Sequence, residues 1–541
     1  MMSQKIFIIL LSLLAAVYGL GLFSGLLEND SAQFAVMAMR MVQESDFWSL
    51  YKGTAPYLDK PHLHYWLAAA SYKIFGIHEW SYKLPGLLAL FLGGYSVYAL
   101  AKHLYNTQVA RVAALLFLST QTIVLSGIDL RTDALLTGFV ALALWQFVVF
   151  ISKPHWRFMA VGALATAMAF STKGHLALVM IVFPLLGHLW FTKQWRLLLR
   201  RETLLGLGVF FIGIAPILYA YYLQFDLHPE LVIRGKSGRS GIFFILWEQS
   251  FERLSGGGMG TNSSDYFFFF HTFLWAFLPF TPVAIYMLLN RLRNRLPSKP
   301  DQGLLYGLIA VFLMISFAQF KLPHYLNASM GLWAILCAGF LNAKGHSALG
   351  LWQKGIFILL SVLSALVMFW LFPPASFWPY ILFIICFIGS YCWVFKEKNR
   401  PVGLVVSGVL AAVLVNGAMN LVFYPSLLQY QAGTQMAKKI QLDPSIDPHQ
   451  IYKWGHGHSW AMDFGLRDPL KIVETPLEIE VLHKSWLYVS AAQLAQLRGS
   501  HVVFNITYAV PKYRITRLKA SFLNPATRAA QLEEMFLIYL D

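Results

Sequence analysis

Long apolar runs separated by short polar connections dominate the chain. Most of the runs approach the roughly 20 residues that a helix needs to cross the apolar part of a bilayer. The runs lie at residues 6–27, 84–101, 109–127, 134–152, 157–171, 175–192, 203–223, 266–289, 303–319, 325–343, 355–373, 377–395 and 402–423. The pattern predicts an all-α polytopic membrane bundle of about thirteen transmembrane helices.

Every second connection between the runs is short and basic, as at 102–111, 153–157, 193–201, 291–299, 344–354 and 396–400. Lys and Arg are enriched in cytoplasmic loops, so we expect these connections in the cytoplasm. The first run is too long for a signal peptide and lacks a clear cleavage site, so we expect it to remain as an uncleaved helix. The segments 28–83 and 224–265 then face outward. The chain is predicted to lie in the cytoplasmic (inner) membrane, with these two segments and the C-terminal segment on the periplasmic or extracytoplasmic side.

The composition changes after residue 424. Strand-like runs at 470–473, 486–489 and 501–507 alternate with helical ones at 427–440, 491–497 and 525–535. We therefore predict two domains: a transmembrane domain over 1–423, and a small α/β extracytoplasmic domain over 424–541. Within the outer segments, 32–41 is expected to form an amphipathic helix on the membrane surface, and 224–265 a mobile basic loop.

Composition supports the membrane assignment. Hydrophobic residues make up 57% of the chain and charged residues only 13%, against roughly 25% charged residues in soluble proteins. The formal charge of +16 is distributed over the loops, which argues against nucleic-acid binding. The three cysteines, Cys337, Cys386 and Cys392, fall inside apolar runs and indicate neither a disulfide framework nor a zinc site.

Two carboxylates lie at the predicted outer membrane surface. Asp30 follows the first helix, and Asp133 opens another beside Arg131. Two carboxylates on one face suit base catalysis, metal binding or the orientation of a sugar hydroxyl. Asp133 also has a simpler explanation, because an acidic residue at a helix N-terminus favours the helix dipole.

Three lysines, Lys60, Lys173 and Lys321, recur at outer helix ends, where the positive-inside bias disfavours them. We interpret them as converging on an anion, a lipid phosphate at the interface, although each alone could contact a headgroup. An arginine of the loop 224–265 could add bidentate contacts. The candidates there are Arg234, Arg239 and Arg253.

Further polar side chains are candidates for substrate or metal contacts. Asp59 and His62 with His64 could hold a divalent metal, as could His456, His458 and Asp463, but neither set has a motif with fixed spacing. Polar loop histidines are the simpler interpretation, and whether a metal is bound stays open. His324 and Tyr325 follow Lys321 in a compact polar motif and join the list of contacts.

Several short motifs occur in a fixed order: 29–35, 57–67 with 75–76, 131–133, 172–174 and 320–325. Together they resemble the polyprenyl-phosphate-dependent GT-C membrane glycosyltransferases, a superfamily that includes protein O-mannosyltransferases and the bacterial aminoarabinose transferases of lipid A. The resemblance implies a sugar donor linked to undecaprenyl or dolichyl phosphate, transferred with inversion. By motif matching, Asp30 takes the catalytic position, Asp133 the second acidic position, and Lys60 and Lys321 the donor-phosphate contacts.

The chain also departs from the family pattern. It has Asp30-Ser31 where the family shows Asp-Glu, and 59–62 reads Asp-Lys-Pro-His in place of Glu-Lys-Pro-Pro. The segment 248–253 looks like the family's loop element near the donor, but a histidine sometimes found there is missing. The motifs name neither the sugar nor the acceptor, which could be a lipid, a glycan or a protein.

Two other functions are compatible with such a chain. A lipid or solute transporter could use Asp30 and Asp133 for proton coupling, although a coupled transporter usually places ionisable residues near the bilayer midplane. The C-terminal domain could instead be a recognition module on an inactive membrane part. The charged residues at the outer helix ends favour the enzyme, with Asp30 as base or acceptor orienter and Lys60, Lys173 and Lys321 on the phosphate.

Overall fold

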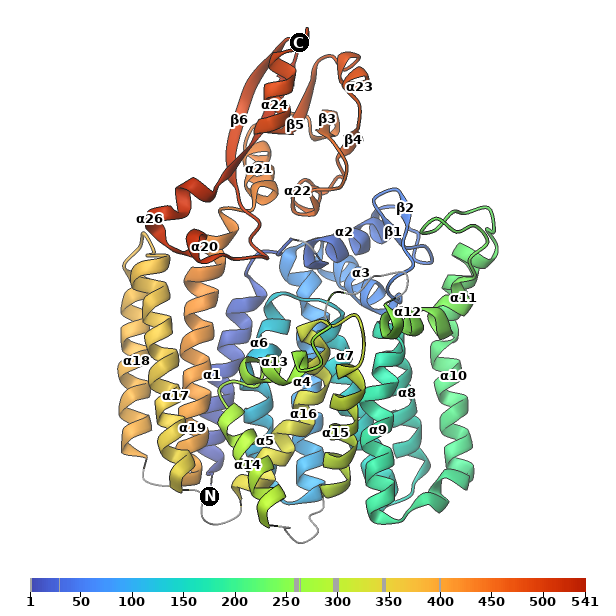
Figure 1. Ribbon diagram of the computed structural model, residues 1–541, viewed down its shortest axis with the longest axis vertical. Helices are drawn as coiled ribbons and strands as arrows, with labels where there is room; N and C mark the ends of the chain where they lie inside the picture. The colour runs from blue at the N-terminus through green and yellow to red at the C-terminus, as the bar shows by residue number, and fades with distance from the viewer. Residues whose placement is uncertain are drawn as a thin grey trace.

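The computed structural model describes residues 2–28, 30–256, 262, 264–294, 301–342, 347–397 and 400–541. Helices run roughly side by side in one bundle, and the C-terminal domain stands on the end of the bundle opposite the N-terminus (Figure 1). A layer formed by α2, α3 and the β1–β2 hairpin lies between the bundle and much of that domain. The mostly helical membrane fold and the mixed C-terminal domain are both confirmed.

Nine helical segments within the described residues are long and apolar enough to cross a membrane, or ten if one bent pair counts as a single span. They are α1 (Gln4–Leu22), α4 (Glu79–Leu104), α7 (Thr132–Ser152), α9 (His175–Thr192), α10 (Arg201–Tyr221) with η2 (Tyr222–Asp226), η4 (Pro323–Ser329) with α16 (Met330–Leu341), α17 (Ser347–Leu366) with η5 (Val367–Leu371), α18 (Trp378–Lys396), and α19 (Arg400–Ala418) with η6 (Met419–Phe423) and α20 (Tyr424–Leu428). The bent pair is α5 (Thr107–Ser119) with α6 (Gln121–Ile128), which meet at 54°.

The predicted count of about thirteen exceeds these nine or ten candidates, and three features of the described helices account for the difference. The run 266–289 divides into α13 (Phe268–Ala276) and α14 (Thr281–Asn294), and α15 (Gln302–Ser316) has only 15 residues. In α8 (Trp156–Lys173), small and polar residues between two basic ends lower the hydropathy. These helices still pack in the bundle among the longer ones (Figure 1).

Small residues let the helices approach closely. A Cβ at Gly138 of α7 would lie 2.1 Å from the carbonyl oxygen of Ala89 on α4, so only glycine fits there. A Cβ at Gly307 of α15 would likewise lie 2.2 Å from the carbonyl oxygen of Phe183 on α9. Such contacts hold membrane helices together by packing, since burial from water contributes little within lipid.

The first outer segment forms α2 (Asp30–Gln43), the hairpin β1 (Tyr51–Lys52) and β2 (Ala55–Pro56), and α3 (Leu63–Phe75). The predicted helix exists. Most residues of α2 are buried, because the helix packs against α3 and against α22 (Trp460–Leu466) of the C-terminal domain. The second outer segment folds into α11 (Gly241–Phe243), η3 (Phe244–Glu248) and α12 (Gln249–Ser255).

The C-terminal domain holds a five-stranded mixed sheet in the order β4-β3-β5-β7-β6. Its strands are β3 (Ile451–Trp454), β4 (Lys471–Val473), β5 (Ser485–Ser490), β6 (Phe504–Lys512) and β7 (Glu533–Leu540). β3 pairs in parallel with β4 and β5, whereas β7 pairs antiparallel with β5 and β6. The prediction missed β3 and β7, and the helix expected over 525–535 ends at α26 (Pro525–Arg528) and a 3-10 turn.

The other elements are shorter connections and cover. They are η1 (Trp195–Leu199), α21 (Ala432–Gln441), η7 (Pro448–Gln450), α23 (Pro476–Glu480), α24 (Ala491–Arg498), α25 (Ala520–Leu523) and η8 (Ala529–Gln531).

Gln431 fastens the end of α1 to the C-terminal domain. Its side-chain oxygen accepts a hydrogen bond from the Glu28 N–H at 2.9 Å, and its side-chain nitrogen donates to the Leu26 carbonyl at 2.9 Å. The Glu28 carboxylate in turn accepts a hydrogen bond from the Ala461 N–H at 3.2 Å. The chain segment that leads to Asp30 is thus held from both sides.

Candidate active site

A buried ion pair lies at the end of the bundle that carries the C-terminal domain. Asp133 is in the first turn of α7, and its carboxylate pairs with the Lys173 ammonium at the last residue of α8. The two side chains are only 5% and 1% exposed. Gly174 ends α8 with φ +62°, a conformation that favours glycine. The tight packing of α7 on α8 therefore places the two charges together.

His324 and Tyr325 join this pair from a segment far along the chain. His324 Nε2 lies 3.8 Å from Asp133 Oδ2, and the Lys173 ammonium stands 4.8 Å above the centre of the Tyr325 ring. Lys60 is near enough for its charge to act on both Asp133 and His324. Five predicted site residues therefore come together: Lys60, Asp133, Lys173, His324 and Tyr325. Along the chain, Lys60, Lys173 and His324 are more than a hundred residues apart from one another.

Asp30 reaches the same region through Arg131, the residue before α7. The Arg131 guanidinium donates to Asp30 at 2.9 Å and to Asp129 at 2.7 Å. Asp30 is the first residue of α2, and its side chain is 45% exposed, whereas Asp129 is 16% exposed. Arg131 thus fixes a carboxylate that remains open to a ligand.

Lys321 lies beside this group but is enclosed. The residue is 2% exposed, and its ammonium stands 5.5 Å from the centre of the Tyr266 ring. Its backbone exchanges two hydrogen bonds of 2.7 Å with the Asn262 side chain. Lys321 therefore helps to hold the segment before α13 against the motif 320–325.

The segment 224–265, predicted as a mobile basic loop, carries a network of ion pairs. Arg234 pairs with Asp59 and with Glu252, and Arg239 pairs with Glu248 and Glu252. Two predicted phosphate-binding arginines and the candidate contact Asp59 are thus engaged with each other. The Arg253 side chain lies outside the described part of the structure.

The two neighbouring histidines are buried. His62 Nε2 donates one hydrogen bond of 3.0 Å to the Trp48 carbonyl, and His64 Nε2 shares one of 2.9 Å with the Tyr82 hydroxyl. Burial lowers the pKa of both imidazoles to about 4, so they are neutral at physiological pH. The described residues contain no group of three or more His, Cys, Asp or Glu side chains that could hold a metal, and we derive no metal-dependent step.

A large cleft separates Asp30 from the C-terminal domain. Its volume is about 1010 Å³. Six basic residues line it: Lys52, Lys453, Lys512, Arg514, Arg517 and Lys519. The acidic residues on its walls are Glu28, Asp30 and Glu533. Burial raises the pKa of Glu28, against a hydrogen bond from Ala461 that lowers it. The cleft is therefore predominantly positive, with Asp30 at one end.

A second cavity is apolar and lies between membrane helices. It has a volume of about 340 Å³ and is lined by side chains of α7, α8, α9 and α10 and of η1. Apart from Thr166 and Thr203, the lining is hydrophobic or glycine. Such a groove suits a hydrocarbon chain.

Comparisons with known proteins point to one group. Residues 59–220 match the family model described as dolichyl-phosphate-mannose-protein mannosyltransferase. The chain is 26% identical over 345 residues to the undecaprenyl phosphate-alpha-4-amino-4-deoxy-L-arabinose arabinosyl transferase 2 of Proteus mirabilis, covering 62% of this chain and 60% of that one. It is 21% identical over 480 residues to the corresponding transferase of Photorhabdus laumondii, covering 82% and 83%.

These matches make the GT-C glycosyltransferases the group that this chain resembles. The crystal structure of ArnT from Cupriavidus metallidurans bound to undecaprenyl phosphate matches with a TM-score of 0.76 and 15% identity, over 99% of this chain and 98% of that one. The apo form of the same protein gives a TM-score of 0.70 at 17% identity. The resemblance inferred from the motifs is confirmed, and the chain shares the ArnT fold from end to end.

Sequence reasoning overlooked the roles of Arg131, Asp129 and Gln431. Asp129, Arg131 and Asp133 place three charges within five residues between two apolar runs. That density was a usable signal for a charged site, because buried charge near a membrane is costly. Gln431 carries no such signal, since its partners Leu26 and Glu28 lie about four hundred residues away.

Proposed function

We propose that this chain transfers a sugar from a polyprenyl-phosphate donor to an acceptor on the extracytoplasmic face of the cytoplasmic membrane, with inversion at the sugar carbon. The observation that carries the proposal is the convergence of Asp133, Lys173, His324 and Lys60, with Arg131 linking Asp30 to the same end of the bundle. Relatives named as undecaprenyl-phosphate-dependent transferases support the choice of donor.

Lys60 is the cation that we assign to the donor phosphate, because its charge acts on both Asp133 and His324. Lys173 pairs with Asp133, and Lys321 is enclosed under Tyr266. A positive charge aimed at the leaving phosphate stabilises the charge that develops there in the transition state. In this proposal the Asp133–Lys173 pair positions His324 and Tyr325 around the phosphate, and the apolar groove of α7 to α10 takes the prenyl tail.

Asp30 serves the acceptor. Its carboxylate is half exposed, faces the large cleft, and is aimed by Arg131. In a single displacement the acceptor oxygen attacks the sugar carbon as the phosphate leaves, and a carboxylate beside that oxygen orients it or accepts its proton. The hydrogen bond of 2.9 Å from Arg131 fixes the orientation of the Asp30 carboxylate, which both roles require.

The cleft also favours a class of acceptor. Basic side chains outnumber acidic ones on its walls, and four of them, Lys512, Arg514, Arg517 and Lys519, come from one stretch of the C-terminal domain. Clefts lined by one sign of charge concentrate ligands of the opposite sign. We propose that the acceptor carries negative charge near the reacting oxygen.

The test is a transfer assay with the purified full-length protein. It would be incubated in detergent with radiolabelled polyprenyl-phosphate sugars, including the aminoarabinose donor, and with anionic and neutral lipid, glycan and peptide acceptors. We expect transfer to an anionic acceptor. Absence of transfer from every donor, together with solute or lipid movement in reconstituted vesicles, would overturn the proposal in favour of a transporter.

A further inference from the structure

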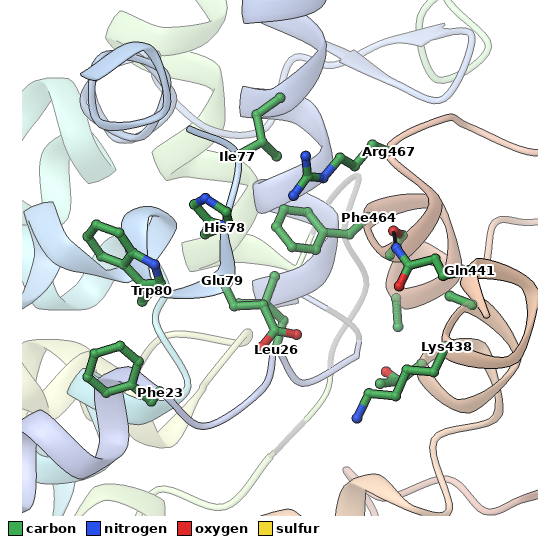
Figure 2. Close-up of a pocket in the computed structure, with 14 residues that line it drawn as sticks. Phe23, Leu26, Ile77, His78, Glu79, Trp80, Lys438, Gln441, Phe464 and Arg467 are labelled. Carbon is green, nitrogen blue, oxygen red and sulfur yellow. Dashed lines mark hydrogen bonds between the residues drawn. The ribbon is translucent and has the colours of Figure 1, made fainter. Parts of the chain in front are cut away.

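A separate pocket of about 290 Å³ lies where the outer end of the bundle meets the C-terminal domain. Phe23 and Leu26, which follow α1, and Ile77, His78, Glu79 and Trp80 at the start of α4 form one wall. The opposite wall comes from α21 and α22 of the C-terminal domain, with Lys438, Gln441, Phe464 and Arg467 among its residues (Figure 2). We call it the interdomain pocket. It is far larger than one water requires.

Charges of both signs face this pocket without pairing with each other. Within the described residues, no ion pair within 4 Å involves the Glu79 carboxylate, the Lys438 ammonium or the Arg467 guanidinium. Figure 2 shows the two cationic groups pointing from the C-terminal domain toward the wall that carries Glu79. A ligand that satisfies all three groups must itself carry an anion and a cation.

Arg467 has an unusual backbone conformation that a side chain disfavours. Arg467 ends α22 with φ +58°, the left-handed conformation that usually selects glycine at a helix C-terminus. The Gln43 side chain donates to the Arg467 carbonyl at 2.7 Å and holds the turn. The arginine is thus kept at the rim of the pocket by the packing of α2 against α22.

The pocket also lies at the level of the membrane surface. α1 ends at Leu22 and α4 begins at Glu79, so this is the outer boundary of two membrane-spanning helices. Phe23 is 71% exposed, and the Trp80 and His78 rings are stacked at 6.0 Å. Tryptophan and other amphipathic rings favour the headgroup level of a bilayer.

We propose that the interdomain pocket binds the headgroup of an amine-bearing phospholipid, with its phosphate on Lys438 and Arg467, its ammonium on Glu79, and its acyl chains passing Phe23 into the bilayer. The bound lipid touches both domains, so it fastens the C-terminal domain to the bundle. A headgroup that lacks the amine leaves Glu79 beside a phosphate, which disfavours its binding.

Glu79 has a simpler role as well, because an acidic residue in the first turn of α4 favours the helix dipole. That role affects helix stability by less than about 1 kcal/mol and does not depend on which lipid is present. Lipid selectivity therefore separates the two roles.

The experiment measures lipid retention by the delipidated full-length protein in detergent, using native mass spectrometry with phosphatidylethanolamine or phosphatidylglycerol of matched acyl chains. We expect the wild type to retain phosphatidylethanolamine at least about tenfold more strongly, E79Q to lose that preference, and the double variant K438A/R467A to lose retention of both lipids. Lys439→Ala is the matched control, since Lys439 is also on α21 but stands over the Tyr508 ring at 5.1 Å.

The thermal unfolding temperature is a second readout, which distinguishes lost binding from misfolding. Phosphatidylethanolamine should raise the thermal unfolding temperature of the wild type and of Lys439→Ala, because a ligand that binds only the folded state stabilises it, and should not raise that of K438A/R467A. Equal retention of the two lipids by the wild type would overturn the proposal. Unchanged selectivity in E79Q would also overturn it. So would a protein that retains soluble glycerophosphoethanolamine but not the lipid.

Discussion

The buried pair of Asp133 and Lys173 gives the sharpest prediction for the site. Asp133→Ala leaves the Lys173 ammonium, 1% exposed, without its partner. Removing one member of a buried ion pair costs about 3–5 kcal/mol, because the remaining charge stays desolvated. Replacing both members with apolar residues of similar size is often neutral or stabilising. We therefore expect D133A to be strongly destabilised, and D133L/K173M to recover stability to within about 1 kcal/mol of the wild type.

The two variants separate structure from chemistry. Stability would be measured by unfolding in detergent with increasing denaturant, and sugar transfer by the radiolabelled assay on the folded fraction. If the pair positions His324 and the donor phosphate, D133L/K173M is stable but inactive. A double variant with near wild-type transfer would show that the pair is only structural, and a D133A protein as stable as the wild type would refute the reasoning about burial.

Three further predictions concern other parts of the molecule. Lys60→Met should raise the KM for the donor about 10- to 100-fold, since a hydrogen bond to a charged group contributes about 1.5–3 kcal/mol, with a smaller effect on acceptor KM. The double variant R514Q/R517Q should raise the KM for an anionic acceptor and leave donor KM unchanged, as steady-state kinetics with each substrate varied will show. Burial raises the pKa of Glu28, so the folded state favours the protonated carboxyl. The contribution of Glu28 to the free energy of unfolding is therefore present at acidic pH and is lost as pH rises above about 4 through the folded-state pKa. E28Q should flatten the dependence of unfolding temperature on pH in that range.

Much of the fold followed from periodicity alone. Apolar runs locate the membrane helices because the bilayer leaves few alternatives for the backbone. Fewer helices than the predicted thirteen meet the length and composition of a membrane span, because α8 and α15 are borderline and one run contains the break between α13 and α14. In the C-terminal domain β7 was missed, since the Glu533-Glu534 start of an otherwise apolar run obscures a strand whose position depends on pairing with β5 and β6.

The residues of the proposed site could be named from the sequence, but their contacts with one another could not. Asp133, Lys173 and His324 could be proposed because charge at outer helix ends needs a reason. That Lys173 would neutralise Asp133, or that Arg131 would hold Asp30, depends on helix packing between residues 40 and 101 positions apart. The same holds for Arg234 and Arg239, whose charges suggested a ligand and whose partners Asp59, Glu248 and Glu252 were already in the sequence.

The central claim is that Asp30 acts on the acceptor at a site where a polyprenyl-phosphate sugar is bound. The most direct measurement compares donor binding and sugar transfer in purified D30N, with Glu44→Gln as a control, since Glu44 pairs with Arg40 at the exposed end of α2. We expect D30N to bind the donor within about threefold of the wild type and to lose transfer at least about 100-fold, and E44Q to behave as the wild type. Near-normal transfer by a well-expressed D30N protein would contradict the claim.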